Sequence, residues 1–341
     1  MSSERSPGRR VGVRCDAGPL IGVGHLIRCV ALAEELALRG VAVTFLGDLG
    51  GLTWAAAQLA GRGLPLLAAE AAPDGLVAQA LALGLDAVVL DSYTLAPGTG
   101  AALRAAGLRV LAVVDGDPRG QAADLYVDQN LGAEERGVPL PEGAVRLAGA
   151  CYVLLRDAVR RLRAAPGAEV PRVLCFFGGT DAAGMAHRWA DALAETAVPF
   201  SATLVSPRPL PARPGIAVIP PTDELPELMA GADLVITAAG SSCWELLYLG
   251  VPAALVWVAE NQLIGYEALV GRELVAGLGP GDSAAEAVPL LRELLTRPAL
   301  RARYAARGRG LVDGRGRERV AGALLHDLRL RGTEARTGWP C

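Results

Sequence analysis

Lysine is absent from this chain of 341 residues, because all 33 basic side chains are arginines. This excludes enzymes that form a Schiff base through a lysine, and those that need the lysine of a phosphate-binding P-loop. The six cysteines include no CxxC pair and no Cys/His cluster with the spacing of a zinc site. Chemistry in this protein must therefore depend on His, Asp, Glu, Asn, Arg, Cys or the ends of helices.

The chain also lacks an excess of basic residues and a long apolar run. The 36 acidic residues give a formal net charge of −3, whereas nucleic-acid binders normally carry a basic patch. The longest apolar stretch, 246–259, is interrupted by Gly250 and Pro252 and is shorter than the roughly 20 residues of a membrane span. The first ten residues lack the apolar core of a signal peptide. We therefore expect a cytoplasmic protein without nucleic-acid or membrane partners, acting as a monomer or weak dimer.

What is present is a regular alternation of two patterns. Short apolar runs bounded by Gly and Pro alternate with Ala/Leu/Arg stretches of helical period, which is typical of βαβ units. Helices are predicted to begin near residues 25, 53, 74, 98, 183, 224, 242 and 261. Strands are predicted at 11–15, 42–46, 87–90, 109–114, 125–127, 173–177, 202–205, 234–237 and 253–256.

A Pro/Gly-containing stretch at 163–171 without apolar periodicity marks the expected domain boundary. We predict an N-terminal α/β domain at 1–165, a C-terminal α/β domain at 170–310 and a helical tail at 311–341. The fold class is thus α/β, with two doubly wound, Rossmann-like domains facing each other across a cleft. In such sheets ligands collect at the carboxyl ends of the strands.

The first candidate site is the glycine-rich loop that ends in His25, which opens a helix. The loop resembles a dinucleotide fingerprint, but Ile27 stands where the third glycine belongs. A histidine at a helix N-terminus lies in positive potential, which disfavours its protonated form. A neutral imidazole suits a general base, although a histidine that only hydrogen-bonds the loop is an equal alternative.

Two turns rich in small residues follow strands of the second half. Such turns let backbone N–H groups approach a phosphate, and the helix that follows each turn adds a favourable potential. Together they predict a diphosphate-binding site, with a glutamate one turn into the second helix placed to bind a ribose diol. Each turn taken singly is more simply a capped tight turn. The residues concerned are Gly178, Gly179, Thr180 and Asp181 in the first turn, and Gly240, Ser241, Ser242 and Glu245 in the second.

Two shorter polar segments also follow predicted strands. Asn261 and Gln262 belong to a polar run that either caps a helix or presents an amide to a water or a sugar hydroxyl. Asp115 and Asp117 form a DxD triplet, the metal-nucleotide motif of one glycosyltransferase class, but a turn capped by carboxylates is the favoured interpretation. We accordingly predict no metal site and no cofactor.

Taken in order, these segments resemble the UDP-sugar hydrolase family of the pseudaminic acid pathway (PseG), together with the related spore-coat polysaccharide proteins. The resemblance covers residues 11–265. It is carried by the segments RCDAGPLIGVGHLIRC, DSYTL, VVDGD, LYVDQN, CYVLLRDAV, FFGGTDAAG, LVITAAGSSCWELLYLGVPAALVW and AENQ.

The resemblance implies a GT-B type fold and release of UDP from a UDP-linked amino or deoxy sugar, with water attacking the anomeric carbon and no metal. It implies that His25 is the base for water, that Asn261 lies near the reacting centre, and that Glu245 and the glycine turns bind the nucleotide. One departure is the family's VDD, which is here Val114-Asp115-Gly116, so that one carboxylate is lost. The residues that the resemblance places on the substrate side are Arg14, Asp16, Gly24, Tyr93 and Gln262.

Three alternatives stay open. The first is a glycosyltransferase of the same fold, which passes the sugar to an acceptor other than water. The second is a catalytically silent protein that binds a nucleotide sugar. The third, a dehydrogenase of the Rossmann class, requires binding of NAD(P)H.

Overall fold

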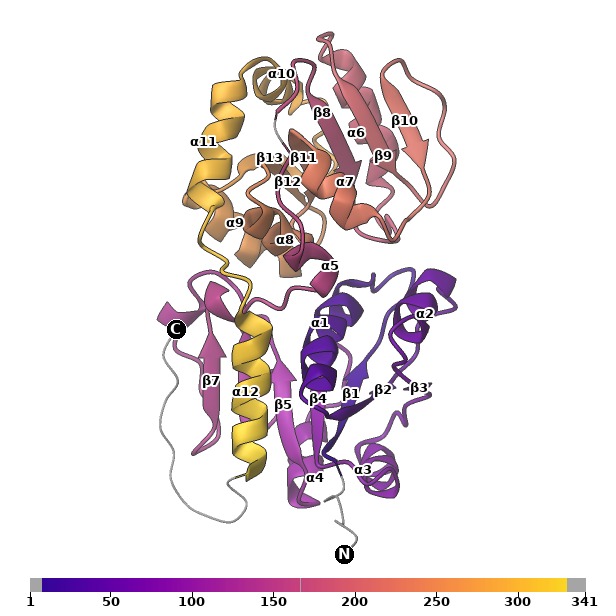
Figure 1. The fold of residues 1–341 in the computed structure, drawn as a ribbon, viewed down its shortest axis with the longest axis vertical. Helices are drawn as coiled ribbons and strands as arrows, with labels where there is room; N and C mark the ends of the chain where they lie inside the picture. Colours follow the sequence, from indigo (N-terminus) through magenta and orange to yellow (C-terminus); the bar gives the residue numbers. More distant parts are fainter. Residues whose placement is uncertain (1–7, 166, 330–341) are drawn as a thin grey trace, which may run out of the picture. The chain divides into compact units, whose positions relative to one another are not determined.

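The computed structural model describes residues 8–165 and 167–329. The chain divides into two compact units (Figure 1), and each is considered by itself. Unit 1 comprises Met1–Gly18, His25–Arg156 and Gly314–Cys341, and unit 2 comprises Pro19–Gly24 and Asp157–Asp313.

The sheet of unit 1 has seven parallel strands in the order β3-β2-β1-β4-β5-β6-β7. Its strands are β1 (Arg10–Cys15), β2 (Ala42–Leu46), β3 (Leu66–Leu67), β4 (Ala87–Asp91), β5 (Arg109–Val113), β6 (Leu125–Asp128) and β7 (Val145–Ala148). Its helices are α1 (Gly24–Leu38), α2 (Thr53–Ala60), α3 (Pro73–Ala82), α4 (Thr99–Ala105) and α12 (Gly316–Arg329), with the 3₁₀ turns η1 (Ala133–Glu135) and η2 (Ala150–Tyr152).

The sheet of unit 2 has six parallel strands in the order β10-β9-β8-β11-β12-β13. Its strands are β8 (Arg172–Phe176), β9 (Ser201–Val205), β10 (Ile216–Ile219), β11 (Leu234–Ala238), β12 (Ala253–Trp257) and β13 (Ala276–Pro280). Its helices are α5 (Asp157–Arg160), α6 (Met185–Glu195), α7 (Leu225–Gly231), α8 (Ser242–Leu249), α9 (Leu263–Gly271), α10 (Val288–Thr296) and α11 (Pro298–Gly308), with the 3₁₀ turn η3 (Glu260–Gln262).

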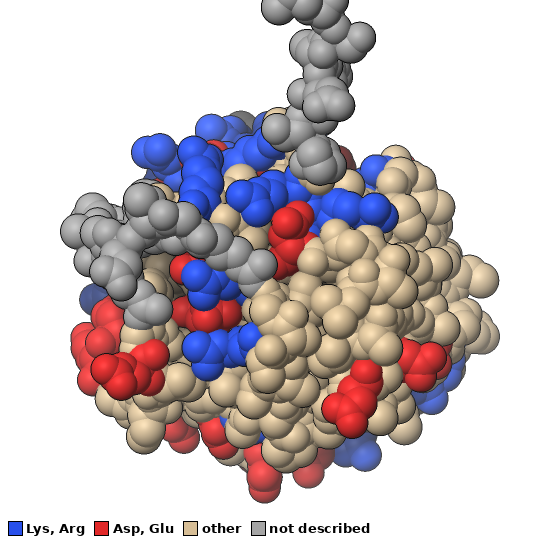
Figure 2. All heavy atoms as spheres, turned by 90° about the horizontal axis from the view of Figure 1, so that it is seen from below, with Lys and Arg blue, Asp and Glu red and all other residues tan. Residues whose placement is uncertain are grey.

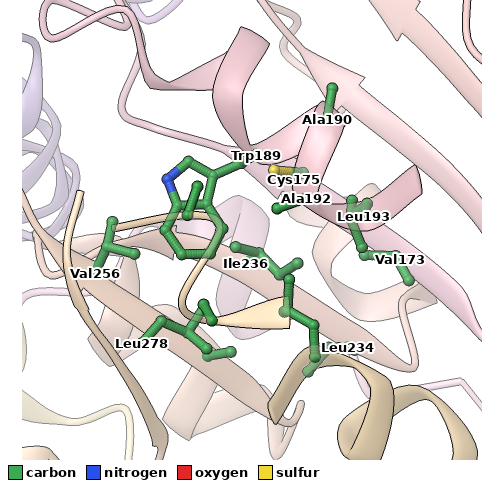
Figure 3. Packing of buried hydrophobic residues seen from close by; sticks show 14 of the residues in the cluster. Val173, Cys175, Trp189, Ala190, Ala192, Leu193, Leu234, Ile236, Val256 and Leu278 are labelled. Carbon is green, nitrogen blue, oxygen red and sulfur yellow. The ribbon is translucent and has the colours of Figure 1, made fainter. Parts of the chain in front are cut away.

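The central strands are buried on both faces, which explains their continuous apolar sequences. Every residue of β4 and of β11 is buried. In unit 2 the side chain of Trp189 from α6 is fully buried beside Ile236, Val256 and Leu278 (Figure 3). Its indole N–H donates to the carbonyl oxygen of Gly281 at 3.0 Å, so the polar atom of this large side chain is satisfied inside the core.

Helix ends follow ordinary local rules. Proline occupies the first turn of α3, α7, α10 and α11, where its missing N–H costs nothing. Gly250 ends α8 with a φ of 71°, a left-handed conformation that glycine adopts without strain. This sharp ending lets the chain turn directly into β12.

The fold confirms the prediction of two doubly wound α/β domains, and four additional strands complete the sheets. These are β3, β7, β10 and β13, and each is the edge strand of its sheet. Edge strands are partly exposed, and their local signals differ. The apolar sequence IAVI of β10 is a signal that the prediction did not use, whereas an arginine interrupts the sequence VRLA of β7. The strand β13, with the sequence AGLGP, has the composition of a turn.

The units also divide the chain differently from the predicted ranges 1–165, 170–310 and 311–341. The change of unit occurs between Arg156 and Asp157, because α5 packs against α7 and the Arg160 carbonyl accepts a hydrogen bond from the Tyr248 hydroxyl at 3.0 Å. The predicted tail contains α12, which belongs to unit 1. Residues 330–341 lie outside the described part of the chain.

Ion pairs of a buried arginine attach α12 to the rest of unit 1. The side chain of Arg317 is 1% exposed and forms ion pairs with Glu34 at 3.0 Å and with Glu35 at 3.4 Å, both on α1. Gly316, at the start of α12, packs so closely on the backbone of Val153 that an added Cβ would lie 2.3 Å from its carbonyl oxygen. The C-terminal helix is therefore part of the packed unit.

Charges on the surface are of mixed sign. Figure 2 shows a face on which arginine side chains gather, with carboxylates among them. In unit 1, Arg104 pairs with Asp124 at 3.1 Å and Arg9 with Asp86 at 3.4 Å. Along the segments 8–165 and 167–329, no helix is long and apolar enough to cross a membrane.

The close contact at Gly316 generates a stability prediction. Gly316→Ala places a methyl group against backbone atoms that cannot move aside, and we expect a loss of about 1–3 kcal/mol or more in the free energy of unfolding. Gly322→Ala is the matched control on the same helix, since its Cβ meets only the end of the Arg39 side chain at 3.4 Å. Alanine is favoured over glycine within a helix, so this control should be neutral or stabilising. Urea denaturation followed by circular dichroism measures both, and equal effects would contradict the packing argument.

Candidate active site

The strand order of unit 1 places a switch point between β1 and β4. The chain continues from β1 to β2 on one side, whereas β4 to β7 extend on the other side. Open α/β sheets bind ligands at such points, beyond the carboxyl ends of the strands. Cys15 at the end of β1 is paired in register with Asp91 at the end of β4. A fully buried carboxylate therefore lies at the position where ligand binding is expected.

His25, in the first turn of α1, contacts this carboxylate directly. Its Nδ1 atom lies 2.6 Å from Oδ1 of Asp91, and the histidine is 8% exposed. Two unprotonated acceptor atoms would repel each other at this distance, so we assign the proton to Nδ1. In the neutral imidazole, Nε2 then carries the lone pair. The pair has the geometry of a general base oriented by a carboxylate.

Arg28, three residues further along α1, holds the same carboxylate. Its Nε donates to Oδ2 of Asp91 and its Nη2 to Oδ1, both at 2.6 Å. Its Nη1 faces both oxygens of Asp115 at 3.2 Å. Burial alone would raise the pKa of Asp91, but the Arg28 guanidinium, together with His25, outweighs burial and holds that pKa below its usual value. Asp91 is accordingly ionised at neutral pH.

Tyr93 and Asp115 extend this cluster. The Tyr93 hydroxyl donates a short hydrogen bond to Asp115, and the tyrosine and His25 rings meet edge to face with centroids 4.5 Å apart. The Arg119 guanidinium lies 4.2 Å above the Tyr93 ring. Burial works to raise the pKa of Asp115, but Arg28 and the Tyr93 hydroxyl lower it overall. Asn130 continues the network, donating from Nδ2 to Asp115 at 3.0 Å.

Arg14 and Asp16, predicted on the substrate side, pair with each other. Arg14 Nη1 donates to Asp16 Oδ1 at 2.7 Å, and the same oxygen accepts the backbone N–H of Asp48 at 3.0 Å. The pair thus joins the loop after β1 to the loop after β2. These contacts are structural, and a role in substrate binding stays a prediction. Gly24 is the first residue of α1.

In unit 2 the predicted nucleotide residues follow neighbouring strands. The strands β8, β11 and β12 are adjacent in the sheet, and β8 and β11 flank the switch point of this unit. The turns that leave them therefore meet at one edge of the sheet. Those turns carry Gly178, Gly179, Thr180 and Asp181 after β8, Gly240, Ser241 and Ser242 after β11, and Asn261 and Gln262 after β12.

Two of these residues already have structural partners. The buried Asp181 carboxylate accepts the backbone N–H groups of Met185 at 2.7 Å and Ala186 at 3.2 Å, so it occupies the N-terminus of α6. Burial raises the pKa of Asp181 overall, although these bonds oppose the rise. Gln262 Oε1 accepts the backbone N–H of Val258 at 2.9 Å, which braces the turn after β12. Both side chains shape turns, and a direct contact with nucleotide or sugar stays a prediction.

The remaining predicted residues of unit 2 differ in accessibility. Gly240 and Asn261 are exposed, Ser241 and Ser242 are half-buried, and Glu245 is buried in the first turn of α8. The Ser241 side chain makes no capping hydrogen bond to α8. A Cβ at Gly240 would meet nothing within 4 Å, although the N–H of Gly240 already donates to the Ala238 carbonyl oxygen at 2.7 Å. Such a turn at a helix N-terminus suits a phosphate.

The DxD triplet has other partners than a metal. Asp115 belongs to the Arg28 cluster, and Asp117 accepts the backbone N–H of Arg119 at 2.8 Å. In the portion of the chain that the structure describes, no group of three or more His, Cys, Asp or Glu side chains could hold a metal ion.

Three members of the cluster had no assigned role in the sequence prediction. Arg28 lies three residues after His25, so the helical period places both on one face of α1, and this signal was available. Asp91 is an acidic residue at the end of an apolar strand, which also marks the carboxyl edge of the sheet. Asn130 lies outside the element that contains Asp115, and the sequence carries no sign of their contact.

Comparison with known proteins agrees with this architecture. Residues 208–273, which span α7 to α9, match the glycosyltransferase family 28 C-terminal domain. The spore coat polysaccharide biosynthesis protein SpsG of Bacillus subtilis (strain 168) is 30% identical over 118 residues, which span about a third of each protein (34% and 34%). A UDP-N-acetylglucosamine–N-acetylmuramyl-(pentapeptide) pyrophosphoryl-undecaprenol N-acetylglucosamine transferase of Xanthomonas oryzae pv. oryzae (strain MAFF 311018) is 28% identical over 356 aligned positions, covering 89% of this chain and 77% of the transferase.

Solved structures extend the likeness to the whole fold. MurG of Acinetobacter baumannii matches with a TM-score of 0.65 and 17% identity, covering 93% of this chain and 99% of that one. The spinosyn forosaminyltransferase SpnP matches with a TM-score of 0.68 and 16% identity, covering 95% of this chain and 100% of that one. The chain therefore has the GT-B fold, and it is glycosyltransferase-like in fold and in the sequence of its second unit.

Proposed function

We propose that this chain is an enzyme that uses a UDP-linked sugar and transfers the sugar to a hydroxyl group activated by His25. The observation that carries the proposal is the His25–Asp91 pair, with Nδ1 and Oδ1 at 2.6 Å and a neutral Nε2 left to accept a proton. The pair lies at the switch point of unit 1, where an α/β sheet binds its ligand.

Unit 2 would bind the nucleotide. The family 28 match covers the turn at 240–242 and the helix that carries Glu245. The name of the transferase that covers 89% of this chain includes UDP-N-acetylglucosamine. Backbone N–H groups of the turns after β8 and β11 would receive the diphosphate, and Glu245 the ribose. This division needs no lysine, because amides and helix ends supply the positive potential.

The chemistry is a single displacement at the anomeric carbon. His25 Nε2 takes the proton of the attacking hydroxyl, whose oxygen forms the new bond to the anomeric carbon. The bond from that carbon to the diphosphate oxygen breaks, and UDP leaves with the bonding electrons. A positioned base contributes about 10²–10⁴-fold in rate, and stabilisation of the leaving group by preorganised N–H donors adds a comparable factor.

The origin of the hydroxyl distinguishes two candidate functions. The relative that covers 89% of this chain is named as a transferase, which supports an acceptor other than water. The second candidate is hydrolysis of a UDP-linked amino or deoxy sugar in pseudaminic-acid-like biosynthesis. It is supported by the ordered motifs from RCDAG to AENQ in this sequence. In either reaction Asn261 would orient the nucleophile or the sugar, and Arg14, Asp16, Tyr93 and Gln262 would border the sugar.

Replacement of the base tests the common mechanism. We expect His25→Asn to lower kcat by about 10²–10⁴-fold, with UDP affinity unchanged because the nucleotide is assigned to unit 2. His187→Asn is the matched control, since His187 is an exposed histidine of α6 that pairs only with its neighbour Asp191. Turnover is measured by UDP release and affinity by calorimetry. Equal loss of turnover and of UDP affinity would identify His25 as a structural residue.

A panel of nucleotide sugars separates hydrolysis from transfer. The protein is incubated with each donor in H₂¹⁸O, with and without candidate hydroxyl acceptors, and products are followed by phosphorus NMR and mass spectrometry. Hydrolysis predicts UDP release without an acceptor and the label in the free sugar. Transfer predicts UDP release only with an acceptor and no label in the product. Formation of UMP and sugar phosphate, or a failure to bind UDP, would contradict the proposal.

A further inference from the structure

Arg28 joins the buried carboxylate of Asp91 to the half-buried carboxylate of Asp115. Its side chain is 7% exposed, Asp91 lies at the end of β4, and Asp115 follows β5. The guanidinium uses one edge, Nε and Nη2, for the two oxygens of Asp91, and Nη1 faces Asp115. Only a planar fork of donors fits both carboxylates at once.

This contact determines the state of Asp91. Two carboxylates at one buried site repel each other, and without a cation one of them would take up a proton. A protonated or rotated Asp91 would no longer present an anionic oxygen to Nδ1 of His25. The imidazole would then lose the hydrogen bond that selects its tautomer.

The other groups around His25 do not replace this function. The Tyr93 ring and the imidazole meet edge to face, while the Tyr93 hydroxyl is bound to Asp115. The Cys29 thiol, on α1, donates to Asp91 Oδ2 at 3.3 Å and carries no charge, because its pKa is raised by its hydrogen bond with Cys15 and by burial. The Arg28 guanidinium itself comes within 3.2 Å of Nδ1, so Arg28, Asp91 and His25 form one contiguous cluster.

We propose that Arg28 is a positioning residue: by holding Asp91 in one orientation, it keeps His25 in the Nδ1–H tautomer with Nε2 unprotonated. Its catalytic consequence rests on the proposed function, but the tautomer is a property of unit 1 that is measurable without substrate. Experiments can therefore reject the positioning role and the proposed function independently.

The experiment compares Arg28→Met and Arg28→Lys with the unmodified chain by ¹⁵N NMR of the imidazole nitrogens. The chain has three histidines, and His25→Asn identifies the signals of His25. We expect the Nδ1–H tautomer in the unmodified protein and a mixture of tautomers in Arg28→Met. Lysine keeps the positive charge but lacks the planar set of N–H donors, so Arg28→Lys should show an intermediate proportion of the Nδ1–H tautomer. Arg39→Met is the matched control, because Arg39 follows the same helix and pairs with Glu35 outside the cluster.

Activity gives the second readout. With a nucleotide-sugar substrate we expect Arg28→Met to lower kcat by about 10–100-fold, the usual effect of losing a residue that orients another group, with UDP affinity unchanged. Arg28→Lys should recover part of kcat.

An unchanged Nδ1–H tautomer in both variants would overturn the proposal, whatever the change in kcat. If Arg28→Met does not fold by circular dichroism, Arg28→Lys decides, and an unaltered tautomer and kcat in that variant refute the positioning role. A changed tautomer in a protein that never releases UDP from any donor would uphold the role of Arg28 and reject the proposed function.

Discussion

The buried ion pair between Arg28 and Asp91 is the constraint on which the candidate site depends. A carboxylate with no exposed surface is costly to keep ionised unless a partner with good geometry offsets its lost hydration. Arg28 supplies two hydrogen bonds of 2.6 Å to Asp91, and Asp91 in turn orients His25. The fold makes this arrangement possible, because α1 starts beside β4 at the switch point of the sheet.

The candidate residues of the two units differ in chemistry. Unit 1 gathers charged side chains, which in the proposed function would serve proton transfer and recognition of hydroxyl groups. Unit 2 presents short turns of glycine and serine at the carboxyl ends of β8 and β11, where backbone amides suit an oxyanion. Asp181 shows that this edge is built by local capping as well, since its carboxylate takes the first amides of α6. A Cβ would meet nothing within 4 Å at either Gly178 or Gly240, so both turns leave room beside their backbone.

The sequence predicts the parts of the fold that local patterns determine. Central strands such as β2 and β4 are continuous apolar runs, and they were predicted within a residue of their observed limits. The glycine-rich edge strand β13 gives no such signal, whereas the edge strand β10 is an apolar run, IAVI, that the prediction did not assign. Likewise, the helix start at His25 indicates a candidate base, whereas its partner Asp91 lies 66 positions away. Pairing over that distance is a product of strand order, which composition and periodicity do not encode.

The position between Asp91 and Asp115 suits an arginine and not a lysine. A buried lysine between two carboxylates is a single point charge, which shifts its pKa readily and cannot hold two oxygens of one carboxylate in a plane. Arginine stays charged at every physiological pH. Burial works to lower the pKa of Arg28, but the Asp115 and Asp91 carboxylates outweigh burial and raise that pKa above its ordinary value. A fixed cation keeps Asp91 anionic, and the anion accepts the hydrogen bond from Nδ1 of His25. In the proposed reaction, the group that orients His25 would thus keep one charge state.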